Sequence, residues 1–203
     1  MVLEFVQQEK DLFSAKFDIC LQNASIGFAE MTGHLGSMEG IWAGKLNNTK
    51  FEMCFDNRTG IQNIKTFRPY KIILNDSSSG FVYQTSNKCG LLSKYDFEQI
   101  SMDNIVYNLF PIGFGTEGSK NPIYCGEQQI ALVEKDCKVI NDLHKYLITA
   151  ISEESAVIAV LFCCYMFVNA CYKPGTKITS SVEKVISTTK NKTLLDKYNP
   201  QFK

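Results

Sequence analysis

The chain has 203 residues, of which 45% are hydrophobic and 21% are charged. These values are ordinary for a globular protein, and the length fits one domain with or without a tail. Its 21 basic and 21 acidic residues give a formal net charge of zero, so the overall basic field of a nucleic-acid-binding protein is absent and we expect no nucleic-acid partner.

The first nine residues, Met1 to Glu9, alternate between apolar and polar like a strand. They contain no basic region followed by a long apolar run, so they do not read as a signal peptide. Eight cysteines are scattered along the chain, three of them in one apolar segment. Without a secretion signal we expect reduced thiols and a cytoplasmic protein, with a peripheral position at a membrane left open.

Short alternating segments separated by turn residues follow in quick succession. They predict roughly ten to twelve strands, the pattern of an antiparallel sandwich or barrel. Strands do not alternate with helices, so we do not expect a parallel sheet. Residues 33–44 read as a glycine-rich connection. The predicted strands are Phe13–Leu21, Ile26–Met31, Phe51–Phe55, Ile61–Phe67, Tyr70–Leu74, Phe81–Thr85, Leu91–Ile100, Ile105–Phe114, Ile123–Cys125, Gln129–Lys135 and Tyr146–Ile151.

One hydrophobic helix is predicted near the C-terminus, at about residues 152–173. From Ala156 to Tyr172, sixteen of seventeen residues are apolar and none is charged. Ser152 is a suitable N-cap, the two glutamates after it complement the helix dipole, and Pro174-Gly175 ends the helix. Because no polar stripe recurs at helical spacing, every face of this helix needs to be buried.

The sequence offers two places to bury this helix. The apolar part spans about 26 Å at roughly 1.5 Å per residue, slightly less than the roughly 30 Å hydrocarbon core of a bilayer. We favour the interior of the protein's own sheet, because the strand-rich body needs something to fill it. The alternative is a membrane-anchored protein in which residues 156–172 span the bilayer.

Many short strands followed by one wholly apolar helix resemble the tubby-like superfamily, which includes tubby C-terminal domains, LURP-one-related proteins and phospholipid scramblases. Local runs resemble it as well: Phe13–Leu21 with Ile26-Gly27, Pro122–Tyr124, Gln129–Lys135, and Asp142–Ile148 leading into the helix. The resemblance covers residues 1–174. It implies a mainly β fold, a closed antiparallel barrel of about twelve strands enclosing the hydrophobic C-terminal helix.

Two further structural expectations accompany this fold. Residues 175–203 form a polar, lysine-rich tail, with a short helix on the barrel exterior as one option. Alternate large apolar residues of the strands should face the lumen and pack against the helix. These residues are Phe17, Ile19, Phe28, Phe51, Met53, Phe55, Ile130 and Leu132.

The resemblance implies a non-enzymatic binding module, for a phosphoinositide or other anionic lipid head group or for a protein partner. The candidate ligand-binding residues are Lys65, Arg68 and Lys71, which lie close together in the sequence with two aromatic residues between them. The simpler interpretation of these three charges is that they face solvent on the outside of the barrel without binding a ligand. A scramblase-like membrane protein and an enzyme with an unrecognised Cys/His site are the alternatives. We expect a monomer.

Motifs for catalysis, cofactors and metals are weak or missing. Residues 113–118 spell G-x-G-x-x-G, but Pro122 follows closely and no strand–helix–strand unit surrounds the motif, so a glycine-rich loop is expected. No cysteine pair has C-x-x-C spacing, and the only histidines are His34 and His144. We therefore predict no catalytic residue, no cofactor and no metal site.

Overall fold

The computed structural model describes residues 1–10, 14–33, 40–56, 67–89, 94–141, 143–170, 184–185 and 192–203. Strands dominate these residues, with one α-helix and two short 3-10 helices. The elements are β1 Val2–Lys10, β2 Ser14–Leu21, β3 Ala24–Gly33, β4 Gly40–Leu46, β5 Thr49–Phe55, β6 Phe67–Leu74, β7 Ser77–Lys88, β8 Lys94–Met102, β9 Ile105–Leu109, β10 Ile112–Gly113, η1 Gly115–Glu117, β11 Ser119–Cys125, β12 Gln128–Lys135, β13 Lys138–Val139, β14 Lys145–Ala150, α2 Glu153–Ala170, β15 Lys184–Val185 and η2 Lys192–Lys197.

Twelve strands form a closed antiparallel barrel. Their order is β11-β12-β14-β1-β2-β3-β4-β5-β6-β7-β8-β9, and β9 pairs back onto β11 to close the ring. The two-residue strand β10 also pairs with β11, and β13 pairs with β15 in a separate small sheet. The predicted fold class, a mainly β barrel of about twelve strands, is confirmed.

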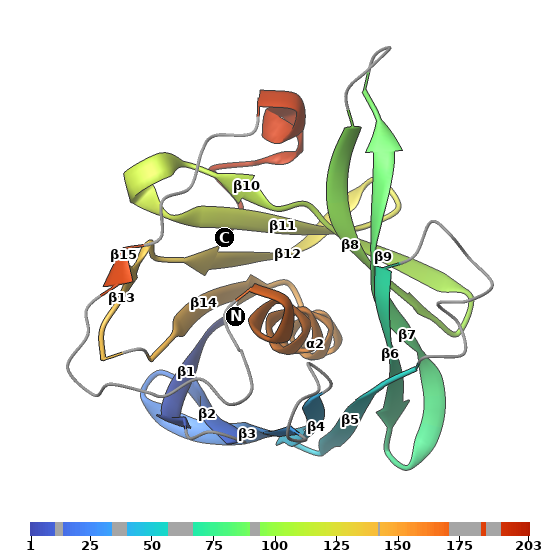
Figure 1. Cartoon of the computed structure of the whole chain (residues 1–203), viewed down its shortest axis with the longest axis vertical. Helices are drawn as coiled ribbons and strands as arrows, with labels where there is room; N and C mark the ends of the chain where they lie inside the picture. The colour runs from blue at the N-terminus through green and yellow to red at the C-terminus, as the bar shows by residue number, and fades with distance from the viewer. Residues whose placement is uncertain are drawn as a thin grey trace.

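Helix α2 fills this barrel (Figure 1). Its residues 156–165 are essentially inaccessible to solvent and share one core cluster with inward-facing side chains of the strands. The ring of Phe167 packs edge-on against Phe17 and Trp42, with centroids 5.0 and 5.9 Å away. A barrel of twelve strands is too wide for its own side chains to fill, so the helix supplies the missing core.

The start of α2 is the predicted one. The Ser152 hydroxyl accepts a hydrogen bond from the backbone N–H of Ser155 at 3.1 Å, as an N-cap does. The predicted end at residues 173–175 lies outside the described residues. None of the helices in the described part of the chain has the length and hydrophobicity of a membrane span.

The two ends of the barrel differ. At the end where α2 begins, two-residue turns join the strands, and asparagine or aspartate with positive φ occupies most of them. Asn47 in one such turn donates a hydrogen bond to the Glu153 carboxylate at 2.9 Å. At the opposite end, the connections 110–118 and 136–144 are longer. Connecting loops tolerate insertions and carry binding residues more often than the strands that they join, so this end of the barrel is the better place to look for a site.

Several strand predictions need correction. The glycine-rich stretch contains a strand, β4. Gly44 is needed there because a Cβ would lie 2.4 Å from the Phe51 ring. The predicted separation between two strands around residues 67–70 is also wrong, since β6 is continuous from Phe67 to Leu74, while residues 61–66 lie outside the described residues.

The expected lumen-facing set is right at most positions and wrong at two. Phe28 is 50% exposed, because Ala29 and Met31 face inward instead. Leu132 is buried but stands outside the core cluster, to which its neighbours Ala131 and Val133 belong. Five of the others belong to that cluster and one packs against it: Phe17, Ile19, Phe51, Met53 and Ile130, and then Phe55.

Candidate functional site: a lysine-lined groove at the barrel rim

A groove of about 840 Å³ opens at the barrel end that carries the longer connections. This volume is within the range of small-molecule sites, roughly 300–1,000 Å³. The groove is built from β1, η1, β11, β12, the segment around β13, and β14. Its described lining residues are Val6, Gln7, Thr116, Glu117, Ser119, Lys120, Glu134, Lys135, Asp136, Lys138, Ile140, Asn141, Leu143, His144, Lys145 and Leu147.

The lysines distinguish this groove chemically. Four lysines and three acidic side chains among the described lining give it a formal charge of +1. A second groove, of about 220 Å³ on the outer face of β3–β6, holds two lysines and two acidic side chains, Lys45 and Lys50 with Glu52 and Asp76. The rim groove is therefore both the larger and the more basic of the two.

Lys135 is the most buried of these cations. It shares the inward face of β12 with Val133, and its exposed fraction is 8%. Its Nζ lies 3.4 Å from the Asp136 carbonyl oxygen and 5.8 Å from the centre of the Tyr146 ring. A lysine side chain is rarely shielded from water to this extent, so Lys135 is an unusual lining residue of the groove.

Lys120 stands on the opposite, outward face of the barrel wall. It is paired across the sheet with Glu134, and their charged groups are 3.1 Å apart. This hydrogen bond raises the pKa of the Lys120 ammonium. Lys145 is similarly joined to Glu4 on β1. Each cross-strand ion pair fixes one lysine at the edge of the groove.

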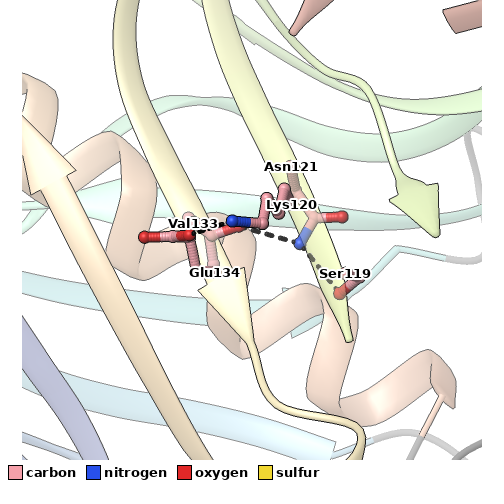
Figure 2. A network of polar contacts seen from close by, with 5 residues as sticks. All are labelled: Ser119, Lys120, Asn121, Val133 and Glu134. Atoms are coloured by element: carbon pink, nitrogen blue, oxygen red, sulfur yellow. Dashed lines mark hydrogen bonds and ion pairs between the residues drawn. The ribbon is translucent and has the colours of Figure 1, made fainter. Parts of the chain in front are cut away.

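Asn121 supports this wall from inside. Its side-chain amide donates to the Val133 carbonyl oxygen at 3.0 Å and to the Ser119 hydroxyl at 3.2 Å. Figure 2 shows this amide and the neighbouring Lys120–Glu134 pair on adjacent strands. Asn121 is fully buried. The bond to Val133 ties β11 to β12 beside the groove.

His144 joins the groove to the central helix. Its backbone N–H donates to the Gln7 side-chain oxygen, and the Gln7 backbone N–H donates to the His144 carbonyl oxygen, both at 2.9 Å. The His144 ring packs edge-on against Phe167 of α2, with centroids 5.5 Å apart. The imidazole is thus part of the packing between the rim and the core.

The structure places the predicted site residues elsewhere or leaves them undescribed. Lys65 lies outside the described residues, and of Arg68 only the backbone, within β6, is described. Lys71 lies in β6, half-buried, and pairs with Cys54 and Phe81. Five strands separate β6 from β14 in the sheet order, so Lys71 is not part of the rim groove.

The groove lysines were not singled out from the sequence. Their segments, 116–120 and 134–147, are separated along the chain and meet only because β12 pairs with both β11 and β14. The available signal was modest: Lys135-Asp136 and Lys138 surround a short turn in which the Asp136 carboxylate accepts the Lys138 N–H at 3.0 Å.

Cysteine and metal chemistry have little support among the described residues. His144 lines the groove, but no cysteine is among its described lining, and His34 lies outside the described residues. Burial raises the pKa of the Cys163 and Cys164 thiols inside α2, which disfavours the reactive thiolate. No cluster of three or more metal-ligating side chains occurs in the described part of the chain.

Comparisons of the chain with protein-family models, with curated proteins and with solved structures returned no match. Function therefore has to be inferred from the geometry of the groove.

Proposed function

We propose that this chain is a non-enzymatic binding module of the tubby-like kind, and that its rim groove holds the anionic group of the ligand. The observation that carries the proposal is that four lysines, from β11, β12, β13 and β14, line one groove. An anion there would lie beside a cation that the fold already holds out of water, where electrostatic attraction is stronger than at an exposed surface.

The chemistry that suits the groove is a phosphate group. Lysine ammonium groups bind phosphate as point charges, and the roughly 840 Å³ volume admits a head group rather than a single ion. The phosphate belongs to a phosphoinositide or another anionic lipid, or to a soluble phosphorylated molecule. The barrel supports this reading, because a closed twelve-stranded barrel around a hydrophobic helix is the architecture that the tubby-like resemblance implies.

The test compares two double variants of the full chain. Lys138→Glu with Lys145→Glu takes the formal charge of the rim groove from +1 to −3, because each reversal changes it by two units. Lys45→Glu with Lys50→Glu makes the same charge change at the smaller groove. All four lysines are exposed, so both proteins should fold, and any effect of overall charge is matched.

Binding is measured to phosphatidylcholine vesicles with and without phosphatidylinositol 4,5-bisphosphate, to phosphatidylserine vesicles, and to soluble inositol trisphosphate by calorimetry. We expect the rim variant to lose at least about tenfold in affinity, since a cation near an anionic surface contributes about 1 kcal/mol, and the matched variant to bind like wild type. Binding to vesicles alone identifies a lipid, and binding to inositol trisphosphate identifies the phosphorylated head group.

Unchanged binding by the rim variant, or an equal loss in both variants, would contradict the assignment of the groove. A Lys71→Glu variant tests the described member of the sequence-predicted set in the same assay. A loss confined to that variant would move the site to β6.

A further inference from the structure

The C-terminal segment, residues 192–203, contacts the outside of the barrel. Its short helix η2 lies outside the ring of strands, beside β10 (Figure 1). Leu194 of η2 is 1% exposed. It is buried among Phe97 of β8, Ile112 of β10 and Phe110, which lies between β9 and β10. This cluster is separate from the core inside the barrel.

A second set of contacts fixes the segment after the leucine. The Tyr124 hydroxyl donates to the Lys197 carbonyl oxygen at 2.8 Å. The Lys197 Nζ lies 5.6 Å from the Phe110 ring centre and 5.4 Å from that of Tyr124. Tyr198 packs edge-on against Phe114, with ring centroids 5.1 Å apart. The segment therefore has a leucine anchor and a tyrosine anchor four residues apart.

These contacts resemble those of a bound peptide more than those of a core element. A six-residue 3-10 helix has no stability of its own in water, so the barrel surface must hold it in this shape. Leu194 is the only fully buried side chain among residues 192–203, and Thr193 and Asp196 are exposed. A few anchors on one side and solvent on the other are typical of a short helix lying in a groove.

The surface beneath the segment is suited to such a ligand. Phe97, Phe110 and Ile112 are apolar residues outside the barrel core that Leu194 helps to cover, and a contiguous apolar surface marks an interaction site. The Tyr124 hydroxyl adds a directed donor for a peptide carbonyl, and the Phe110 and Tyr124 rings attract a cation. Apolar, hydrogen-bonding and cation-binding features together define what the surface recognises.

We propose that the outer face formed by Phe97, Phe110, Ile112 and Tyr124 is a peptide-docking site, which the chain's own Leu194–Tyr198 occupies as a tethered ligand. It accepts from a partner protein a segment with a leucine, a tyrosine four residues later and a lysine just before that tyrosine. The chemistry of the partner is inferred from the segment that occupies the site. The proposal goes beyond anion binding in the rim groove.

The experiment uses the full chain with Leu194→Asp, which removes the buried anchor without touching the barrel. The probe is a fluorescein-labelled peptide of residues 190–203, whose binding is followed by fluorescence anisotropy. We expect the peptide to bind the variant saturably and to bind wild type at least tenfold more weakly, because the tethered copy competes. A probe with Asp in place of the leucine should not bind.

Two further variants sharpen the result. Ile41→Asp places the same charge on β4, at a residue that is 42% exposed and lines neither groove, and it should bind the peptide no better than wild type. Tyr198→Ala removes only the second anchor of the tethered copy and should bind the peptide more tightly than wild type does. Adding Phe110→Ser to Leu194→Asp should abolish binding.

The proposal is overturned if folded Leu194→Asp protein fails to bind the peptide. It is also overturned if Leu194→Asp and Tyr198→Ala both lose cooperative unfolding, since the segment would then be an essential part of the core. A concentration-dependent wild-type dimer that the peptide dissociates would replace the partner protein by a second copy of the chain. Anion binding at the rim groove is judged from the Lys138→Glu/Lys145→Glu variant alone, because the Tyr198 ring centre lies 5.7 Å from the Lys120 Nζ and Tyr198→Ala therefore affects the edge of that groove as well.

Discussion

Gln7 and His144 exchange two hydrogen bonds across the rim of the barrel, each 2.9 Å long. One uses the Gln7 side chain and the other uses both backbones, so the pairing of β1 with β14 continues past its last regular pair, Val6 with Lys145. The Gln7 side chain is therefore a structural link beneath the lysine-lined groove, and its 2% exposed fraction makes its loss costly.

Replacing Gln7 by alanine should lower the free energy of unfolding by about 1–3 kcal/mol, because the buried N–H of His144 loses its acceptor. The midpoint of urea denaturation measures this change. Gln128→Ala, at an exposed position on β12, is the matched control and should change stability by less than about 0.5 kcal/mol. Equal effects of the two substitutions would show that the link contributes nothing.

Charging the middle of α2 should prevent soluble folding. Phe162 is fully buried inside the barrel, and an unpaired buried charge costs several kcal/mol. We expect Phe162→Asp protein to pellet on ultracentrifugation or to lack a cooperative thermal transition. Phe28→Asp, on the outer face, should remain soluble and folded. A Phe162→Asp variant that unfolds like wild type is incompatible with a helix enclosed by the strands.

Stability should fall as pH rises through the range of Glu98. Burial raises the pKa of this carboxyl to about 7 from an ordinary 4.5, and its Oε2 atom has no hydrogen-bond partner in the described part of the chain. The folded state therefore binds the proton more tightly than the unfolded state. The stabilisation is fully present below about pH 4.5 and is lost as pH rises to about 7.

Glu98→Gln removes this dependence, because its amide stays neutral. At pH 8 the variant should be more stable than wild type by roughly 1–2 kcal/mol. Converting the whole pKa shift at about 1.4 kcal/mol for each unit would give a larger gain. The expected gain is smaller because the Glu98 side chain is only partly buried and solvent screens its charge. Urea denaturation at pH 5 and pH 8 measures the difference. Glu52→Gln, at an exposed site, should show no such gain, and a Glu98→Gln protein that is less stable at pH 8 refutes the assignment.

Removing the N-cap of α2 should destabilise the protein measurably. Ser152→Ala deletes the acceptor for the Ser155 N–H and should cost about 0.5–2 kcal/mol, whereas Ser152→Asp keeps an acceptor and should cost less. Thermal unfolding followed by circular dichroism distinguishes the two. If the aspartate variant is the less stable one, the hydroxyl has a role other than capping.

The helix and the barrel could be predicted because their signals are local. An uncharged apolar run after Ser152 and a series of alternating segments are both visible within short windows. Individual faces were harder. A bulge in β12, opposite Ile123 and Tyr124 of β11, makes Ile130 an extra residue, so simple alternation places Leu132 on the wrong face. At Phe28, the smaller Ala29 takes the interior position.

The groove could not be predicted because its residues are brought together by strand order. Lys120 and Lys145 come from strands that share only β12 as a neighbour, and the sequence does not say which strands pair. The same holds for β4, whose Gly40 and Gly44 make room for the Met31 and Phe51 side chains of neighbouring strands. A glycine chosen for tight sheet packing looks like a loop residue when its partners are unknown.

The position of α2 in the chain has a consequence for biosynthesis. All twelve barrel strands precede it, and β1 pairs with β14, about 140 residues later. During translation the inward faces of the strands emerge before the helix that covers them, so the ring cannot reach its native packing until Glu153–Ala170 has left the ribosome. Closing a barrel through such non-local strand pairing is slow, and the intermediates expose hydrophobic surface and are prone to aggregate. We therefore expect the yield of folded protein in cells to rise with chaperone supply, and to respond to it more than to small changes at the protein surface.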